Sequence, residues 1–279
     1  MSLKPTRTKT KSPASSTNSG LQFKKKSKKE PNRSFVIYGP SGTGKTTLSG
    51  TFPKPILFAD VKDRGTDSIS EYSEDEIRIT EIESFEDIEL LVEEIRANPG
   101  LYKTVVIDTV TQMQQLAIEE VVAAKKKKTK KAAGDWGSMT MRDWGDVSSK
   151  MKEWIIALRD LPVQTVFLAQ HRVFNSSDEG DDAEEQLAPE VGPRLSPSTA
   201  SHLNAAVDVI GSTFIRERIV VKTVNGKKVK KKKTEYCLRI GPNPIYTSKI
   251  RKPKNIEVPD FVVNPSYEDI VAIIKGEVE

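Results

Sequence analysis

Short runs of apolar residues recur along the chain and alternate with segments in which apolar positions return every three or four residues. The clearest runs lie at residues 35–38, 55–60, 104–108 and 163–169. Runs of this length are typical of strands, and strands that are apolar on both sides indicate a parallel sheet covered on both faces. A weaker run at 77–80 predicts a further, peripheral strand.

Helical segments separate these strands. One helix begins at Ser84, where Ser84 and Asp87 make a capping-box pattern, and it ends at Asn98-Pro99-Gly100. Further helices are predicted at about 111–124, 196–206 and 266–275. The alternation predicts an α/β fold with a mostly parallel sheet and helices on both faces.

The C-terminal third has a different pattern. A strand at 207–214 precedes two strand-like segments, 218–224 and 227–233, which flank the hairpin signal Asn225-Gly226. Residues 236–240 would close the sheet. We therefore predict a β-hairpin extension, and we divide the chain into a disordered basic tail at 1–32, a main domain at 33–258 and a C-terminal helix segment at 259–279 that packs on it.

The first strand leads directly into a glycine-rich loop with the pattern G-x-x-x-x-G-K-[ST]. The glycines allow backbone N–H groups to surround an anion, and the start of the next helix adds more of them. Lys45 would reach the β- and γ-phosphates, and Thr46 would place its hydroxyl on Mg²⁺. The sequence predicts a site for ATP and Mg²⁺ formed by Gly39, Pro40, Ser41, Gly42, Thr43, Gly44, Lys45, Thr46 and Thr47.

Two later strands end in polar residues that belong at the same edge of a parallel sheet. Asp108 ends the strand at 104–108, where an acid can support the Mg²⁺ shell, although it can equally cap the next helix. Gln170 follows the strand at 163–169 and can contact the γ-phosphate or an attacking water, unless it is only a solvent-facing strand end. A long segment without periodicity follows, with an acidic run at 178–185.

Composition restricts the class of protein further. One cysteine, Cys237, excludes an internal disulfide framework, and two histidines leave no plausible zinc cluster. Neither a run of about 20 apolar residues nor a secretory signal is present. We expect a soluble cytoplasmic protein that binds no membrane.

Positive charge is concentrated in three segments. Residues 1–33, 125–131 and 227–233 hold 22 of the 44 Lys and Arg residues but only one of the 39 acidic residues, so the rest carries a net charge of −16. Such segments are typical of a protein that binds a polyanion such as single-stranded DNA, and they can also simply keep loops solvated. Trp136 and Trp144 are candidates for stacking on bases or for burial against the sheet.

Taken in order, the phosphate loop, the Asp108 strand, the Gln170 strand end and Lys249-Ile250-Arg251 resemble the RecA-type core of P-loop NTPases of AAA type. More narrowly, residues 34–255 resemble the core-only phage relatives of RecA, which act as single-strand annealing or recombination ATPases. The residues at 38–40 and 51–55 are similar to those at the corresponding positions in that family.

This resemblance implies roles for individual residues. Lys45 and Thr46 would bind phosphates and Mg²⁺, Asp108 would support the metal, and Gln170 would sense the γ-phosphate at the root of a DNA-binding loop at 172–195. Lys249 and Arg251 would reach across a subunit boundary to the γ-phosphate held by a neighbour. The protein would then be a homo-oligomer, as a ring or a filament, with ATP sites completed by assembly.

The chain departs from the family pattern after the second strand. Where the family usually places a glutamate that activates water, the sequence has Lys62, and Asp63 or Asp60 would have to substitute for it. Three functions therefore compete. These are an ATPase that acts on single-stranded DNA in phage annealing or recombination, a non-hydrolysing nucleotide switch or recombination mediator, and a small-molecule P-loop kinase.

Overall fold

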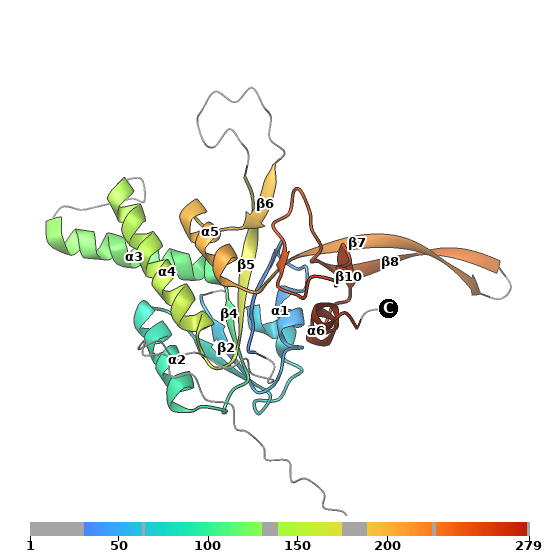
Figure 1. The fold of residues 1–279 in the computed structure, drawn as a ribbon, viewed down its shortest axis with the longest axis horizontal. Coiled ribbons are helices and arrows are strands. Elements are labelled where there is room, and N and C mark those ends of the chain that lie inside the picture. Colours follow the sequence, from blue (N-terminus) through green and yellow to red (C-terminus); the bar gives the residue numbers. More distant parts are fainter. Residues whose placement is uncertain (1–30, 63–64, 130–138, 175–188, 225–226, 278–279) are drawn as a thin grey trace, which may run out of the picture. The chain divides into compact units, whose positions relative to one another are not determined.

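The computed structural model describes residues 31–62, 65–129, 139–174, 189–224 and 227–277, and all of these except Pro31 fall within one compact unit, Asn32–Glu279. Its main feature is a sheet in the order β10-β8-β7-β1-β5-β4-β2-β3 (Figure 1). The strands on this path are β1 (Ser34–Gly39), β2 (Ile56–Asp60), β3 (Ile77–Glu81), β4 (Thr104–Asp108), β5 (Gln164–Phe174), β7 (Val209–Val224), β8 (Lys227–Arg239) and β10 (Phe261–Val263).

The six strands from β7 to β3 are parallel, and β8 and β10 extend one edge, each antiparallel to the strand before it in the sheet. Two short strands lie off this path: β6 (Glu190–Pro193) pairs with β5, and β9 (Lys249–Ile250) pairs with β7. The prediction of a mostly parallel α/β sheet with an appended hairpin is confirmed.

Alternate residues of the parallel strands enter two different cores. On one face, Val36 and Tyr38 of β1 pack in a cluster with α2 (Phe85–Ala97), α3 (Val110–Thr129), α4 (Met141–Arg159) and α5 (Pro197–Ala206). On the other face, Phe35 and Ile37 pack with α1 (Lys45–Ser49), the 3₁₀ turn η1 (Gly65–Ile69) and α6 (Tyr267–Lys275). The buried strands therefore have apolar residues at consecutive positions.

The helix ends follow their sequence signals. Ser84 and Asp87 form the expected reciprocal capping box at the start of α2. Ser266 and Asp269 form another at α6, which buries Ile270, Ile273 and Ile274. None of the helices that the structure describes is long and apolar enough to cross a lipid bilayer.

Two segments differ from the prediction. The separate strands expected at 207–224 and 227–240 are one continuous ribbon, paired from Ser212 opposite Arg239 to Val224 opposite Lys227. In addition, β5 runs past Gln170 to Phe174 and pairs with β6 inside the expected loop at 172–195. Residues 175–188 of that loop lie outside the described residues.

Candidate functional site

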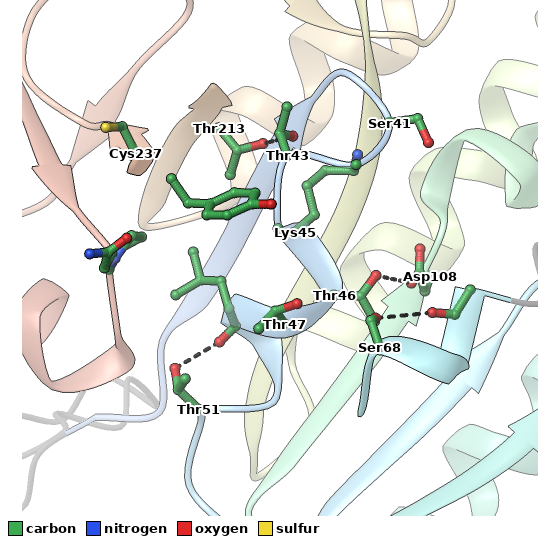
Figure 2. Close-up of a pocket in the computed structure, with 17 residues that line it drawn as sticks. Ser41, Thr43, Lys45, Thr46, Thr47, Thr51, Ser68, Asp108, Thr213 and Cys237 are labelled. Atoms are coloured by element: carbon green, nitrogen blue, oxygen red, sulfur yellow. Dashed lines mark hydrogen bonds between the residues drawn. The ribbon is translucent and has the colours of Figure 1, made fainter. Parts of the chain in front are cut away.

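The loop between β1 and α1 closes tightly against the hairpin (Figure 2). A Cβ added to Gly39 would lie 2.3 Å from Thr213 Oγ1 and 2.6 Å from the Thr213 carbonyl oxygen, so this position requires glycine. Gly42 and Gly44 have φ values of +74° and +85°, which side-chain-bearing residues rarely adopt. Thr43 Oγ1 lies 2.7 Å from Thr213 Oγ1 and fixes the loop to β7.

Lys45 lies across the loop that precedes it. Its ammonium donates to the carbonyl oxygens of Pro40 at 2.8 Å and Gly39 at 3.2 Å. This position places a positive charge over the loop, where the sequence predicts β- and γ-phosphates. A cavity of about 630 Å³ opens here, and its wall includes every predicted residue from Ser41 to Thr47.

Thr46 and Asp108 meet at the floor of this cavity (Figure 2). Thr46 Oγ1 donates to Asp108 Oδ2 at 2.9 Å, and Asp108 is 3% exposed. These are hard oxygen donors of the kind that Mg²⁺ takes from proteins, with water and phosphate completing its shell. One hydroxyl and one carboxylate are too few to hold a metal alone, so this donor set fits an Mg²⁺ that arrives with a nucleotide.

The position at which the resemblance expects a glutamate is occupied by a lysine engaged elsewhere. Lys62 has φ +54°, and its ammonium lies 2.9 Å from Glu119 Oε2 on α3. The hydrogen bond from Lys62 lowers the pKa of Glu119. Asp60 is buried in register beside Asp108, and Asp63 lies outside the described residues. Among the described residues that line the cavity, Asp108 is the one carboxylate.

Gln170 lies next to the phosphate loop but faces a second cavity. It pairs with Gly39 across β1 and β5, and its amide oxygen accepts a 3.1 Å hydrogen bond from Arg194 Nη1. Its backbone N–H donates to Thr111 Oγ1 at 3.2 Å. Gln170 therefore contacts both β1, which carries the phosphate loop, and the residues around the second cavity.

The second cavity has a volume of about 950 Å³, and its wall combines apolar and aromatic side chains with cationic and neutral polar ones. Arg172 and Arg194 contribute positive charge, while Trp144 and Met141 on α4 are 38% and 89% exposed. Trp136, the other candidate for stacking, lies outside the described residues. The wall also contains amide and hydroxyl side chains: Thr111, Gln112, Gln114, Gln115, Ser148, Gln170, Ser196 and Ser198.

Lys249 and Arg251 are not near the phosphate loop of their own chain. Ile250 pairs with Val209, which pairs with Phe35 at the opposite end of β1. Lys249 donates to the carbonyl oxygens of Asn204 and Ala205, and Arg251 binds Asp208 Oδ1 at 3.0 Å. Burial lowers the pKa of Lys249.

Sequence reasoning missed the far wall of the nucleotide cavity. Thr213, Tyr236 and Cys237 come from the root of the β7–β8 hairpin, and Asn264 and Pro265 follow β10. The Asn225-Gly226 turn could have set the pairing of β7 with β8. The sequence contains no signal that β7 pairs with β1, which is what brings the hairpin root to the phosphate loop.

The fold and the phosphate-loop cavity together define a P-loop nucleotide-binding protein of the α/β class. A family profile described as AAA domain matches residues 31–252, which is most of the chain, and the protein therefore belongs to this AAA family.

Other comparisons add little to this assignment. No curated protein matches the chain. One matching solved structure comes from a study described as structural and biochemical analysis of a prototypical ATPase from the type III secretion system of pathogenic bacteria. The two are 11% identical, with a TM-score of 0.40, over 65% of this chain and 52%, or about half, of that one.

Proposed function

We propose that the protein is an ATPase that binds single-stranded DNA and promotes annealing or recombination in phage DNA metabolism. The observation that carries the nucleotide part is the contact between Thr46 and Asp108 beneath a closed phosphate loop. Membership of the AAA family supports nucleotide binding and hydrolysis. When bound, Mg²⁺ would neutralise phosphate charge, held by Thr46 directly and by Asp108 directly or through water.

The second cavity supports the DNA part of the proposal. Arg172 and Arg194 can neutralise backbone phosphates, and the Trp144 ring can stack on a base without selecting its identity. Gln170 joins the two sites, because it pairs with Gly39 and accepts a hydrogen bond from Arg194. A γ-phosphate at the loop could thus alter the position of Arg194 in the second cavity.

A specific observation favours the non-hydrolysing switch as a second candidate. Lys62 is paired with Glu119, and Asp108 is the one carboxylate among the described cavity-lining residues. Asp108 is already assigned to the metal, so activation of water requires Asp60, Asp63 or a residue from a neighbouring subunit. Lys249 and Arg251, which lie far from their own phosphate loop, are proposed to complete the neighbour's site in a homo-oligomer.

The decisive experiment measures ATP turnover and ATP affinity with and without single-stranded DNA. Stimulation of turnover by DNA supports the ATPase, whereas DNA binding without turnover supports the switch. We expect Lys45→Ala to weaken ATP binding by about a hundredfold or more, since it removes a charge over the phosphates. Lys103→Ala, at the start of β4 and remote from the loop, is the control. Equal ATP affinity of the two variants would contradict the proposed site.

The role of the second cavity in DNA binding is tested separately. Trp144→Ala should weaken binding of single-stranded DNA by about five- to a hundredfold, the usual range for one stacked base. Arg194→Ala is the second cavity variant. Its control is Arg96→Ala, which removes an exposed arginine on α2. Unchanged DNA affinity in both cavity variants would remove the second cavity from the proposal and leave the nucleotide site intact.

A further inference from the structure

The β7–β8 hairpin presents a row of exposed apolar side chains. Ile215, Tyr236, Ile219 and Val221 are 43%, 45%, 65% and 54% exposed. Ile215 lies opposite Tyr236, Ile219 opposite Lys232 and Val221 opposite Lys230, so all six share one face of the ribbon. We call this surface the hairpin stripe (Ile215, Ile219, Val221, Lys230, Lys232 and Tyr236).

The hairpin stripe is apolar and strongly basic at the same time. Residues 216–233 include nine Lys and Arg residues and one acid. A ribbon of this kind cannot bury its apolar side chains against itself, and exposed apolar rows bordered by charge are typical of interaction sites. The stripe begins at Tyr236, which lines the nucleotide cavity.

The opposite edge of the sheet has the complementary character. There α2 follows β3, the last strand of the sheet, and its Leu90 is 62% exposed. Residues 71–96 contain eleven acidic residues and two arginines. We call this surface the acidic edge (Glu86, Glu89, Leu90 and Glu93); its members are exposed and lie three or four residues apart on α2, on the side away from the buried Ile88, Leu91, Val92 and Ile95.

We propose that the hairpin stripe of one copy docks on the acidic edge of a second copy. Leu90 on the acidic edge and the aliphatic residues of the stripe lie among charges of opposite sign, so the two surfaces are complementary in charge and both offer exposed aliphatic groups. Because they lie at opposite ends of the strand order, the contact is head-to-tail and repeats into a ring or a filament. This inference rests on the homo-oligomer of the proposed function and names the surfaces that form it.

The side chains of the stripe favour protein over nucleic acid as its occupant. Along the arm of the ribbon, Ile219 and Val221 are aliphatic and offer no ring on which a base could stack, and the one ring of the stripe, Tyr236, lies at the hairpin root in the wall of the nucleotide cavity. One acid also lies among the cations: Glu217 binds Lys232 at 2.9 Å on the same face. Tyr236 contributes to both the stripe and the wall of the nucleotide cavity, so the stripe extends from the hairpin root outward along the ribbon.

Reciprocal charge reversal tests the contact in sedimentation velocity experiments with Mg²⁺ and ATP. We expect the full-length protein to self-associate, and both Lys230→Glu/Lys232→Glu and Glu86→Lys/Glu89→Lys to weaken this by about a hundredfold or more. Mixing the two variants should restore assembly, because each then offers the other an oppositely charged surface. Lys103→Glu/Lys254→Glu makes the same charge change elsewhere and should assemble normally. Ile219→Ser should weaken assembly without changing charge.

Several results would overturn the inference. The wild-type protein could stay monomeric at every concentration, or the hairpin variant could assemble normally. The mixture of the two charge-reversed variants could also fail to recover assembly. A hairpin variant that assembles normally but loses DNA binding would identify the stripe as a nucleic-acid surface instead. We would also measure ATP and DNA binding by the monomeric variants, whose substitutions are all at exposed positions. Failure of the proposed function would then be distinguishable from failure of the contact.

Discussion

Gly39 is the residue at which the phosphate loop and the hairpin are in closest contact. We expect Gly39→Ala to lower the free energy of unfolding by about 1–3 kcal/mol, because the added methyl group would overlap Thr213. Thr213→Ala should not restore stability, since the Thr213 carbonyl oxygen is also within 2.6 Å of the added Cβ. Urea denaturation of the single and double variants measures both effects.

A matched glycine provides the control. Gly145 in α4 has no atom within 4 Å of an added Cβ, so Gly145→Ala should stabilise the protein by about 0.5–1 kcal/mol. If Gly39→Ala were as stable as the wild type, the close approach of the loop to β7 would be wrong.

At the residue scale, the sequence predicts contacts within one motif better than contacts between elements. Residues 39–47 follow from a single spacing, and Asp108 from a strand-ending acid, so the meeting of residues 41–47 with Asp108 in one cavity could be expected. Tyr236 and Asn264 could not be found, because their place depends on β7 lying beside β1. Nor does any local pattern predict that Lys62 pairs with Glu119, 57 positions along the chain.

The start of α4 shows how one side chain joins two elements. Asp143 closes the capping box with Thr140 and binds Lys125 of α3 at 2.7 Å. The hydrogen bond from Lys125, assisted by those from Thr140, lowers the pKa of Asp143 from 3.8 to about 2. The folded protein therefore favours the ionised form of Asp143 more strongly than the unfolded chain does.

This lowered pKa predicts a pH-dependent contribution to stability. The contribution is complete above pH 3.8 and is lost as the pH falls toward about 2. Asp143→Asn should therefore be less stable than the wild type at neutral pH, and the difference should shrink across that acid window. Thermal unfolding across the pH range measures it, with Asp146→Asn, an exposed aspartate of the same helix, as the control. If the stability difference between Asp143→Asn and the wild type persisted unchanged in acid, it would argue against the ion pair between Lys125 and Asp143.

At the element scale, the predicted helices and buried strands are present because each has its own periodicity and caps. The pairing of β5 with β6 was missed because neither partner has a strand signal of its own: β5 beyond Gln170 divides evenly between polar and apolar residues, and the four-residue β6 contains Gly192 and Pro193. The length of the β7–β8 ribbon was underestimated for a related reason. Cross-strand ion pairs such as Lys232 with Glu217 at 2.9 Å occur in the exposed part of the ribbon, where no apolar core supports it.

The uneven charge of the whole molecule leads to a prediction about salt. Residues 1–30 carry nine Lys and Arg residues and one acid, whereas the compact unit begins at Asn32. Deleting residues 1–30 should leave ATP affinity unchanged. It should also flatten the dependence of single-stranded DNA affinity on salt, by about 0.7 in log–log slope for each phosphate that the tail had neutralised.

Titration of DNA at several salt concentrations gives the two slopes. A full-length chain with the tail lysines replaced by glutamine separates the loss of charge from the loss of length. An unchanged slope in both variants would show that the tail neutralises no phosphate, and DNA binding would then rest on the second cavity and the other lysine segments.

Cys237 gives the hairpin root a chemical reporter of its own. It is the single cysteine of the chain, it is 1% exposed, and it lies in the wall of the nucleotide cavity. Burial raises the pKa of its thiol, so little reactive thiolate is present at neutral pH and alkylation should be slow. The rate of alkylation then measures how often the hairpin root opens to solvent. Slower alkylation in the presence of ATP would show that nucleotide binding stabilises the root of the ribbon, and this measurement needs no engineered probe.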